Sequence, residues 1–321
     1  MIIDLPNTTI SQVSKALVKM REENGVVALG RVLTLIIAAS TGSEEEAIEA
    51  ANDASREHPM RVLVVCTNPA EDGQAAESRL DAEIRVGGDA GASEVIILRA
   101  SGEAASDEQS LVMGLLLPDA PVVTWWPGIA PAVPGLAPLG RIAHRRITDA
   151  SAQPEPQAAL QQLAESYRPG DIDFAWTRLT LWRAQLAAVL DQPPYSPVTS
   201  VRVEGSDDSP STTLLSAWLH DALQADTEFV LTPGATSHGI HSVRLERATG
   251  AIELSRTGGG VARLTQPKQP THSLALPRRN LRDCLADELR RLDPDELYGQ
   301  VITRALATLG PATPITTGTA A

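Results

Sequence analysis

The sequence predicts two domains: an α/β domain with a mostly parallel sheet over residues 1–150, and an α+β domain with a largely antiparallel sheet over residues 151–310. In the first part, apolar runs rich in β-branched residues alternate with helical patterns. In the second part, leading helical segments precede short alternating runs separated by glycine turns. The length of 321 residues also suits about two domains. Residues 311–321 are small and polar, and we expect a disordered tail there.

The first domain contains a βαβ unit. The continuous apolar run 31–40 fits a strand buried on both faces, and the run 61–66 fits a second one. Between them, residues 41–58 have a helical pattern with a capping box formed by Ser43 and Glu46. Because the joins are short, the two strands should be parallel. The same periodicities predict strands over 80–87, 93–100 and 121–126, and helices over 7–25 and 107–118.

The second domain opens with helices and continues as a sheet. Residues 151–170 begin as a polar join and become helical, and residues 171–191 form the strongest helical pattern of the chain. The glycines around residues 250 and 258–260 predict hairpin turns. Alternating apolar and polar residues predict strands near 198–203, 229–231, 240–246, 252–256, 261–264 and 272–276. Helices are predicted near 211–223, 281–292 and 295–309.

Charge and composition exclude several classes of partner. The formal net charge of −13 repels phosphate backbones and anionic membrane surfaces, so we expect neither nucleic acid nor membrane as a partner. We see no secretory signal pattern and no apolar run long enough to span a bilayer. Two distant cysteines, Cys66 and Cys284, do not make a disulfide framework, and a cytoplasmic protein is expected. Cys66 lies in an apolar strand and should be a buried thiol.

The glycine-rich stretch VGGDAGASEVIIL, residues 86–98, raises the question of a phosphate loop. Such a loop needs a helix after its glycines, because the free N–H groups of the helix hold the anion. Here β-branched residues follow, which favour a strand. We therefore expect a loop between two strands. A small backbone nest for an anion stays open as a weak alternative, formed by Gly87, Gly88, Asp89 and Gly91.

The sequence shows no constellation that indicates catalysis or a metal. His238 and His241 are close in sequence, but residues three apart on a strand face opposite sides, and no further ligand lies at a suitable spacing. No nucleophile elbow or metalloprotease motif is present. We therefore expect no catalytic residues, no metal and no cofactor.

Two local features suggest an interaction surface. Residues 117–128 end in Trp125, Trp126 and Pro127, at a strand end where α/β domains place binding crevices. Exposed tryptophans are frequent interface anchors, although two tryptophans in separate layers are the alternative. Positively charged residues are concentrated between residues 140 and 150, and they are Arg141, His144, Arg145 and Arg146. These arginines could bind an anionic ligand or an acidic partner. The alternative is that they lie on a solvated face.

Five long blocks of the sequence, taken in order, resemble the OpcA family of glucose-6-phosphate dehydrogenase assembly proteins, actinobacterial type. They span residues 54–65, 86–98, 115–128, 141–150 and 167–183. The resemblance implies a non-catalytic protein without cofactor that binds glucose-6-phosphate dehydrogenase, promotes its active oligomer and supports NADPH production in the oxidative pentose phosphate pathway. It supplies no catalytic residues.

We hypothesise that Trp125, Trp126 and the charged cluster from Arg141 to Arg146 contribute to the contact with the dehydrogenase. A rival hypothesis is a sensor that holds a sugar phosphate or nucleotide near Trp126 and Arg145 and acts on a partner enzyme. An enzyme of sugar-phosphate metabolism is a third possibility, and it would need catalytic groups that meet only in three dimensions.

Overall fold

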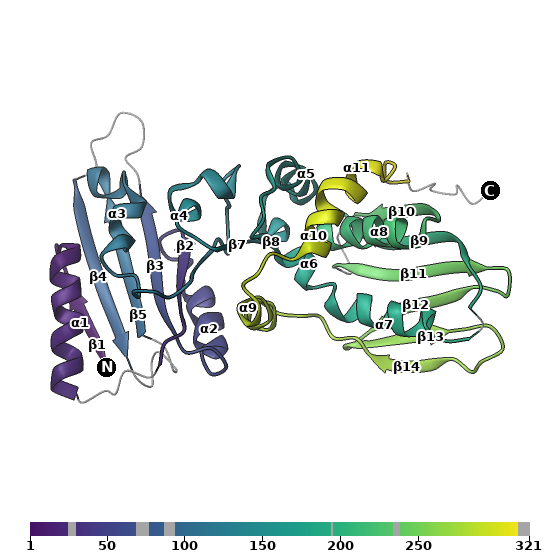
Figure 1. Ribbon diagram of the computed structural model, residues 1–321, viewed down its shortest axis with the longest axis horizontal. Helices are drawn as coiled ribbons and strands as arrows, with labels where there is room; N and C mark the ends of the chain where they lie inside the picture. Colours follow the sequence, from purple (N-terminus) through teal and green to yellow (C-terminus); the bar gives the residue numbers. More distant parts are fainter. Residues whose placement is uncertain (25–29, 69–76, 87–93, 194, 234–237, 314–321) are drawn as a thin grey trace. The chain divides into compact units, whose positions relative to one another are not determined.

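The computed structural model of the chain describes residues 1–24, 30–68, 77–86, 94–193, 195–233 and 238–313 (Figure 1). The chain forms two compact units. The first contains residues 1–149, 170–172 and 280–294, and the second contains residues 150–169, 173–279 and 295–321. One eight-stranded, mostly parallel sheet and one six-stranded, mostly antiparallel sheet confirm the predicted fold class. The prediction that residues 1–150 and 151–310 fold as separate domains stays a prediction.

The sheet of the first unit has the strand order β1-β4-β5-β3-β2-β6-β7-β8. Strands β5, β3, β2, β6 and β7 pair in parallel, whereas β4 is antiparallel to β5 and β1 is antiparallel to β4. The strands are β1 (Ile2–Leu5), β2 (Leu33–Ala39), β3 (Met60–Asn68), β4 (Arg79–Val86), β5 (Glu94–Ser101), β6 (Val122–Trp125), β7 (Arg145–Thr148) and β8 (Asp171–Asp173).

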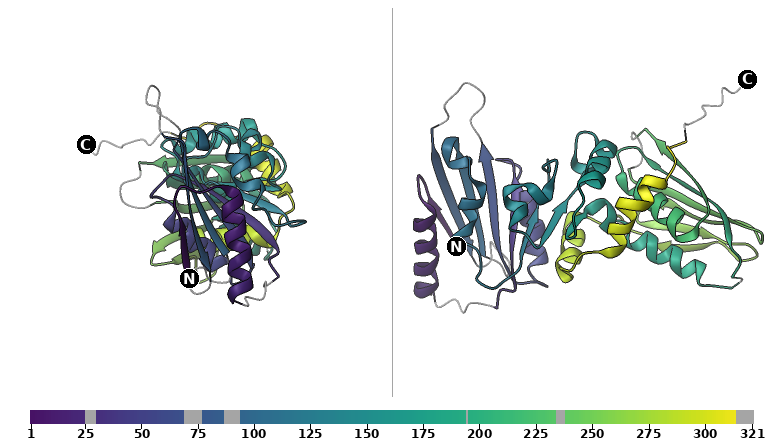
Figure 2. Two further views of the ribbon diagram at one scale, coloured as in Figure 1. Left: turned by 90° about the vertical axis from the view of Figure 1, so that its left-hand side faces the viewer. Right: turned by 45° about the horizontal axis from the view of Figure 1, so that its top comes forward.

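Helices cover both faces of this sheet, as the buried apolar runs of its central strands require. Helix α1 (Ile10–Asn24) lies beside β1 and β4 (Figures 1 and 2), and α3 (Glu108–Met113) contributes to the same core. Helix α2 (Glu45–Ala54) covers the other face and packs against α9 (Leu281–Arg290). The shorter elements are η2 (Gly102–Ala105), η3 (Pro134–Leu136) and α4 (Pro138–Arg141).

The predicted capping box of α2 is wrong. Helix α2 begins later than expected, and its N-cap residue is Glu44 rather than Ser43. The Glu44 carboxylate accepts a hydrogen bond from the backbone N–H of Gly42 and forms an ion pair with Arg99 on β5. A tertiary ion pair therefore fixes the start of this helix in place of the local serine cap.

The sheet of the second unit has the strand order β10-β9-β11-β12-β13-β14. Its pairs are antiparallel except β9 with β10, which are parallel and joined by helix α8 (Pro210–Leu223). Hairpins at the predicted glycine turns join β11 to β12 and β12 to β13. The strands are β9 (Val198–Ser206), β10 (Asp226–Thr232), β11 (Ile240–Arg247), β12 (Ile252–Gly258), β13 (Val261–Thr265) and β14 (His272–Ala275).

The long helix predicted over residues 171–191 is interrupted. Residues 171–173 form strand β8, and the Asp173 carboxylate then caps α6 (Phe174–Thr177) by accepting from the N–H of Ala175 at 2.8 Å. The helical pattern resumes in α7 (Thr180–Leu190). The other helical segments of this unit are η4 (Ala150–Ala152), α5 (Pro156–Ser166), α10 (Glu296–Gln300), the π-helical η5 (Val301–Ala305) and α11 (Leu306–Thr308).

Helix α8 lies close against the sheet of the second unit, over β9 and β10. The close approach depends on Gly205 near the end of β9, because a Cβ atom there would lie 2.1 Å from Oγ1 of Thr212. Near the carboxyl terminus, the N–H of Thr313 donates to the carbonyl of Phe229 at 2.8 Å. Residues 314–321, most of the predicted tail, lie outside the described residues.

Candidate functional site

A cleft of about 510 Å³ opens in the first unit where β2, β3 and β6 end. Because parallel strands end at the same edge of a sheet, Ser40 after β2, Thr67 in β3 and Trp126 after β6 come together there. Trp126 and Pro127, both named from the sequence, line the cleft. The segment that follows them forms one wall with Gly128, Ile129, Ala130 and Pro131.

The polar groups of this cleft do not suit an anion. Its charged residues are Glu46 and Glu108, and among the residues that the structure describes no arginine, lysine or histidine lines it. The Thr67 hydroxyl donates to the Glu108 carboxylate at 3.2 Å. A sugar phosphate would meet two carboxylates and no cation, which is unfavourable. The cleft therefore gives no support to the sensor hypothesis in the form that placed a ligand beside Trp126.

Neither tryptophan is exposed. Trp125 is 0% exposed and Trp126 is 5% exposed. Trp126 belongs to the core between the sheet and helices α1 and α3, while its neighbour on the strand points to the opposite face. The two rings thus pack in separate layers, which is the alternative considered from the sequence. They stabilise the ends of β6 and are not free to act as surface anchors.

Arg145 and Arg146 are also buried, which corrects the expectation of an exposed cluster. Arg145 is 3% exposed and forms an ion pair with Glu288 of α9. Arg146 is 8% exposed and forms an ion pair with Asp171 of β8. Both lie on the short strand β7, so the basic sequence pattern marks internal ion pairs of the first unit.

The two remaining residues of the charged cluster, Arg141 and His144, are exposed. They do not lie together with the tryptophans. The Nδ1 atom of His144 accepts a hydrogen bond from the N–H of Val122 at 3.1 Å, so His144 lies at the amino end of β6. The cleft lies beyond the carboxyl end of that strand. Arg141 ends α4, the helix whose first residue Pro138 lines the cleft.

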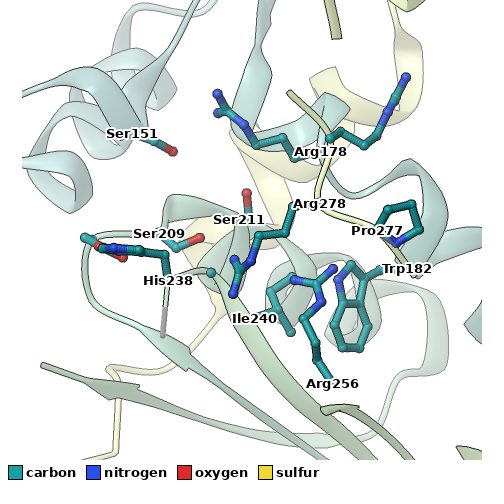
Figure 3. Close-up of a pocket in the computed structure, with 13 residues that line it drawn as sticks. Ser151, Arg178, Trp182, Ser209, Ser211, His238, Ile240, Arg256, Pro277 and Arg278 are labelled. Carbon is teal, nitrogen blue, oxygen red and sulfur yellow. The ribbon is translucent and has the colours of Figure 1, made fainter. Parts of the chain in front are cut away.

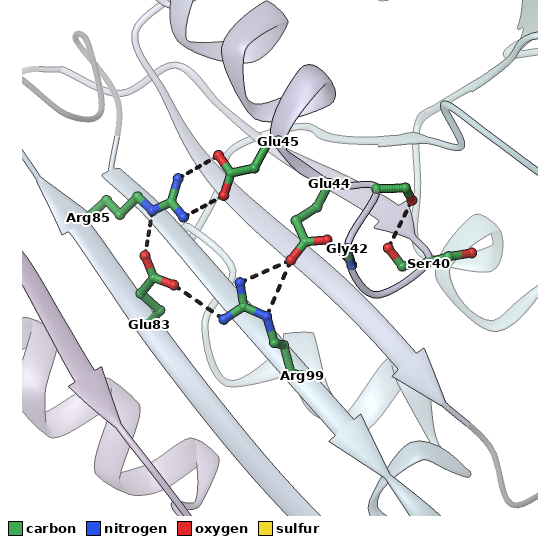
Figure 4. Close-up of polar contacts among 8 residues, drawn as sticks. Ser40, Gly42, Glu44, Glu45, Glu83, Arg85 and Arg99 are labelled. Atoms are coloured by element: carbon green, nitrogen blue, oxygen red, sulfur yellow. Dashed lines mark hydrogen bonds and ion pairs between the residues drawn. The ribbon is translucent and has the colours of Figure 1, made fainter.

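A network of alternating charges lies at the start of α2 (Figure 4). Arg85 donates to both carboxylate oxygens of Glu45 at 2.9 and 2.7 Å and to Glu83 at 2.6 Å. Arg99 joins Glu83 to Glu44. The hydrogen bond from Arg85 lowers the pKa of the Glu45 carboxyl, despite some opposing burial. This network ties the start of α2 to β4 and β5 and thereby positions the loop around Ser40 and Ser43, which line the cleft.

A cavity of about 330 Å³ lies in the second unit (Figure 3). The start of α8 contributes Ser209 and Ser211, and α7 contributes Trp182. Its basic residues come from four places in the sequence and are Arg178, His238, Arg256, Arg278 and Arg279. No local sequence pattern indicates this cavity, because each arginine stands alone or in a pair and only the fold brings them together.

The other sequence-based expectations concern glycines, cysteines, metals and membranes. Gly87, Gly88, Asp89 and Gly91 lie outside the described residues, although the flanking β4 and β5 are adjacent antiparallel strands as expected. Cys66 is buried as predicted. Within the described ranges, no three potential ligand side chains gather as a metal site. None of the helices in the described part of the chain combines the length and apolar character needed to cross a bilayer.

Comparison with known proteins defines the class of this chain. Residues 51–165 match a domain family described as the glucose-6-phosphate dehydrogenase subunit N-terminal domain, and residues 169–302 match the corresponding C-terminal domain. Together these two matches span most of the chain and show its family. The chain belongs to the OpcA family.

A curated relative and several solved structures are similar to the chain. The putative OxPP cycle protein OpcA of Synechocystis sp. is 30% identical over 143 residues, which cover 42% of this chain and 30% of the relative. The chain thus matches less than a third of that protein. A mutant of KijD10, a 3-ketoreductase from Actinomadura kijaniata, has a TM-score of 0.46 at 13% identity, with 86% of this chain and 95% of that chain covered. The myo-inositol dehydrogenase of Lactobacillus casei has a TM-score of 0.44 at 11% identity, with 86% and 93% covered.

Proposed function

We propose that the chain is a non-catalytic assembly factor that binds glucose-6-phosphate dehydrogenase, promotes its active oligomer and supports NADPH production in the oxidative pentose phosphate pathway. The descriptions of both matched domains, each named as part of a subunit of that enzyme, carry this proposal. The name of the curated relative, an OxPP cycle protein, supports the same pathway.

The contact surface that we propose is the segment 127–136, which we call the proline-rich wall. It follows β6 and exposes two large apolar side chains, Ile129 at 74% and Leu136 at 53%. Three prolines restrict its backbone, so little conformational entropy is lost when a partner covers it. Large exposed apolar side chains beside a cleft are typical of an interface centre. Arg141, on the adjoining helix α4, adds positive charge for an acidic partner.

This surface replaces the one expected from the sequence. Pro127 and Arg141 stay in it, while His144 lies at the other end of β6. Trp125, Trp126, Arg145 and Arg146 act through the fold of the first unit, because their side chains are buried. Substitution of Trp126 would leave a cavity in the core and would not test a contact.

The decisive experiment is a titration of this protein into glucose-6-phosphate dehydrogenase from the same organism, with enzyme activity and oligomer mass followed together. We expect activity and mass to rise together and to saturate at a fixed ratio of the two proteins. The Ile129→Asp variant should weaken the interaction by about tenfold or more, because an interface centre cannot bury an unpaired charge cheaply.

The matched control is Val32→Asp, which places the same charge on a 53% exposed aliphatic residue next to the amino end of β2, away from the cleft. It should bind as the wild type does. If the wild type changes neither activity nor mass, the assembly function is wrong. If the wild type acts and both variants act equally well, the function stands and the proline-rich wall is not the contact.

The non-catalytic part of the proposal has its own test. The purified chain alone should show no NADP reduction with glucose 6-phosphate, and the mixture should show only the activity of the dehydrogenase. Turnover by the chain alone, retained after removal of trace dehydrogenase, would contradict it.

A further inference from the structure

The cavity of the second unit is cationic, although the chain as a whole carries a net charge of −13. Four arginines line about 330 Å³: Arg178 from the region between α6 and α7, Arg256 on β12, and Arg278 and Arg279 before α9. Arginine is the side chain best suited to hold phosphate, because its planar fork donates two parallel hydrogen bonds. Arg178 and Arg279 are engaged within the protein, so Arg256 and Arg278 are the candidates to hold an anionic ligand.

Arg256 and Arg278 form no ion pair within the described chain, although the charge of Arg278 lowers the pKa of the Asp208 carboxyl in the same cavity. Arg256 is half-buried; its Nη2 donates to the carbonyl of Leu276 at 3.1 Å, and its guanidinium carbon lies 5.3 Å from the centroid of the Trp182 ring. Its Nε atom is buried and lacks a hydrogen-bond partner among the described residues. Arg278 is exposed and forms no ion pair with any described residue. Figure 3 shows the two guanidinium groups on either side of the Ile240 side chain.

The proximity of these two guanidinium groups is unfavourable without an anion. Burial, together with the charge of Arg278, lowers the pKa of Arg256 to about 10. The backbone makes room for this arrangement at Gly239, whose φ is +77° and where a Cβ would lie 2.6 Å from Nη1 of Arg278. Like charges that are held together in this manner are typical of sites that bind the opposite charge.

The start of helix α8 adds hydrogen-bond donors to the same cavity. Ser209 is the N-cap residue, but its side chain makes no capping hydrogen bond. It is 8% exposed, lines the cavity, and its hydroxyl has no hydrogen-bond partner in the described part of the chain. An N-cap serine ordinarily accepts from the helix backbone. Here the hydroxyl is available to a ligand, at the positive end of a 14-residue helix.

The remaining lining limits what the ligand is. Trp182, Ile240 and Pro277 form an apolar wall, which fits the ring or carbon skeleton of a small molecule. The one carboxylate in the cavity, Asp208, accepts a hydrogen bond from His238. Burial opposes ionisation of Asp208, but hydrogen bonds from Ser206 and His238 lower its pKa. Asp208 is thus engaged with His238, and the positive charge of Arg278 also lowers the pKa of Asp208.

We infer that this cavity binds a phosphorylated small molecule, whose phosphate group is held by Arg256, Arg278 and Ser209 and whose apolar portion lies against Trp182. The site is separate from the cleft of the first unit and from the proline-rich wall. Binding is a property of the chain alone and does not depend on the proposed assembly function.

The test is calorimetric titration of the full chain, without dehydrogenase, using glucose 6-phosphate and glucose as a matched pair of probes. Inorganic phosphate serves as a competitor. We expect glucose 6-phosphate to bind with one molecule per chain, glucose not to bind at millimolar concentration, and phosphate to compete. Arg278→Gln should weaken binding about tenfold or more, because it removes a guanidinium that forms no ion pair within the described chain and would donate to the phosphate.

Two further variants make the result specific. Arg263→Gln on β13 removes the same charge from an exposed position of the same unit outside the cavity, and it should bind as the wild type does. Arg256→Met should lose binding while its thermal unfolding midpoint without ligand stays about equal, because methionine keeps the packing against Trp182 while a half-buried cation without an ion-pair partner is removed. A merely structural arginine would lower that midpoint.

The inference is overturned if neither glucose 6-phosphate nor inorganic phosphate binds at millimolar concentration. It is overturned equally if binding survives in Arg278→Gln and Arg256→Met, or falls by the same factor in Arg263→Gln. Because the dehydrogenase is absent from this titration, failure here leaves the assembly function untouched. Failure of assembly likewise leaves this site untouched.

Discussion

Arg145 on β7 donates to Glu288 through its guanidinium and to the carbonyl of Asp293 through Nη1 at 2.7 Å. Both partners come from the segment 280–294, which lies far away in sequence. An ion pair this deeply buried specifies which segment packs against β7, but it contributes less net stability than its Coulomb energy suggests.

Loss of one partner of this pair should be costly. We expect Arg145→Met to lower the free energy of unfolding by roughly 3 kcal/mol, because Glu288 is then buried without a partner. The double variant Arg145→Met with Glu288→Leu should recover most of the loss. Urea denaturation measures both, and Arg141→Met, at an exposed arginine, is the control with little effect. A double variant no more stable than the single one would show that the charge is not what matters.

Cys66 gives a prediction about pH. Burial raises the pKa of its thiol to about 12, Glu44 adds to the effect and Arg99 opposes it. Because the unfolded thiol ionises near its ordinary value of about 8.5, stability is present below that pH and falls as pH rises toward the folded value, by up to ~1.4 kcal/mol per pH unit. The folded chain should therefore resist alkylation at Cys66 at pH 8.

The measurement for Cys66 combines mass-spectrometric mapping of iodoacetamide adducts with urea denaturation between pH 8 and 10. Adducts at Cys66 should form only in denaturant. The fall of stability with pH should be shallower in Cys66→Ala, which has no thiol to ionise there. Rapid alkylation of the native chain at this residue would contradict the buried position.

The observed helices and strands match those predicted from the sequence where local patterns and tertiary contacts favour the same structure. The buried runs of β2 and β3 and the hairpin turns around Gly250 and Gly258 are examples, because periodicity and turn chemistry act within a few residues. Strand β7 was missed because its arginines suggested a solvated surface, and only their distant carboxylates explain their burial. The interruption at Asp173 was likewise hidden by a continuous apolar pattern.

The start of helix α2 provides a test at the level of one element. Glu44 is buried at 4% exposure and joins the backbone of Gly42 to Arg99, whereas Ser43 donates only one exposed hydrogen bond to the carbonyl of Ser40. We expect Glu44→Gln to cost about 1–3 kcal/mol, since it weakens a charge-assisted bond. Ser43→Ala should cost about 0.5 kcal/mol or less. If the two variants lose equal stability in thermal denaturation, Ser43 caps the helix as the sequence predicted.

The candidate sites depend on the complete fold of each unit, which explains how little of them the sequence revealed. Trp126 and Pro127 were found because strand ends of a parallel sheet are predictable places for a cleft. Ile129 could have been found as a large aliphatic residue in a proline-rich loop. Arg256 and Arg278 carry no local signal, because the cavity depends on the packing of α7, α8 and β12.

The return of residues 280–294 to the first unit leads to a prediction about the fragment 1–150. That fragment contains nearly all of the eight-stranded sheet but lacks α9, which packs against α2 and carries the ion pairs of Arg282 with Asp53 and Arg290 with Glu57. It also lacks both Glu288 and Asp171, so Arg145 and Arg146 would lose their carboxylates together.

Two unpaired charges and an uncovered helix face outweigh the modest net stability of a domain this size. We therefore expect the fragment alone to show no cooperative thermal transition by circular dichroism. The same fragment joined by flexible linkers to residues 169–173 and 279–295 should regain one. A sharp transition in the fragment alone would show that the first 150 residues fold independently, and that α9 is an addition to a domain already complete.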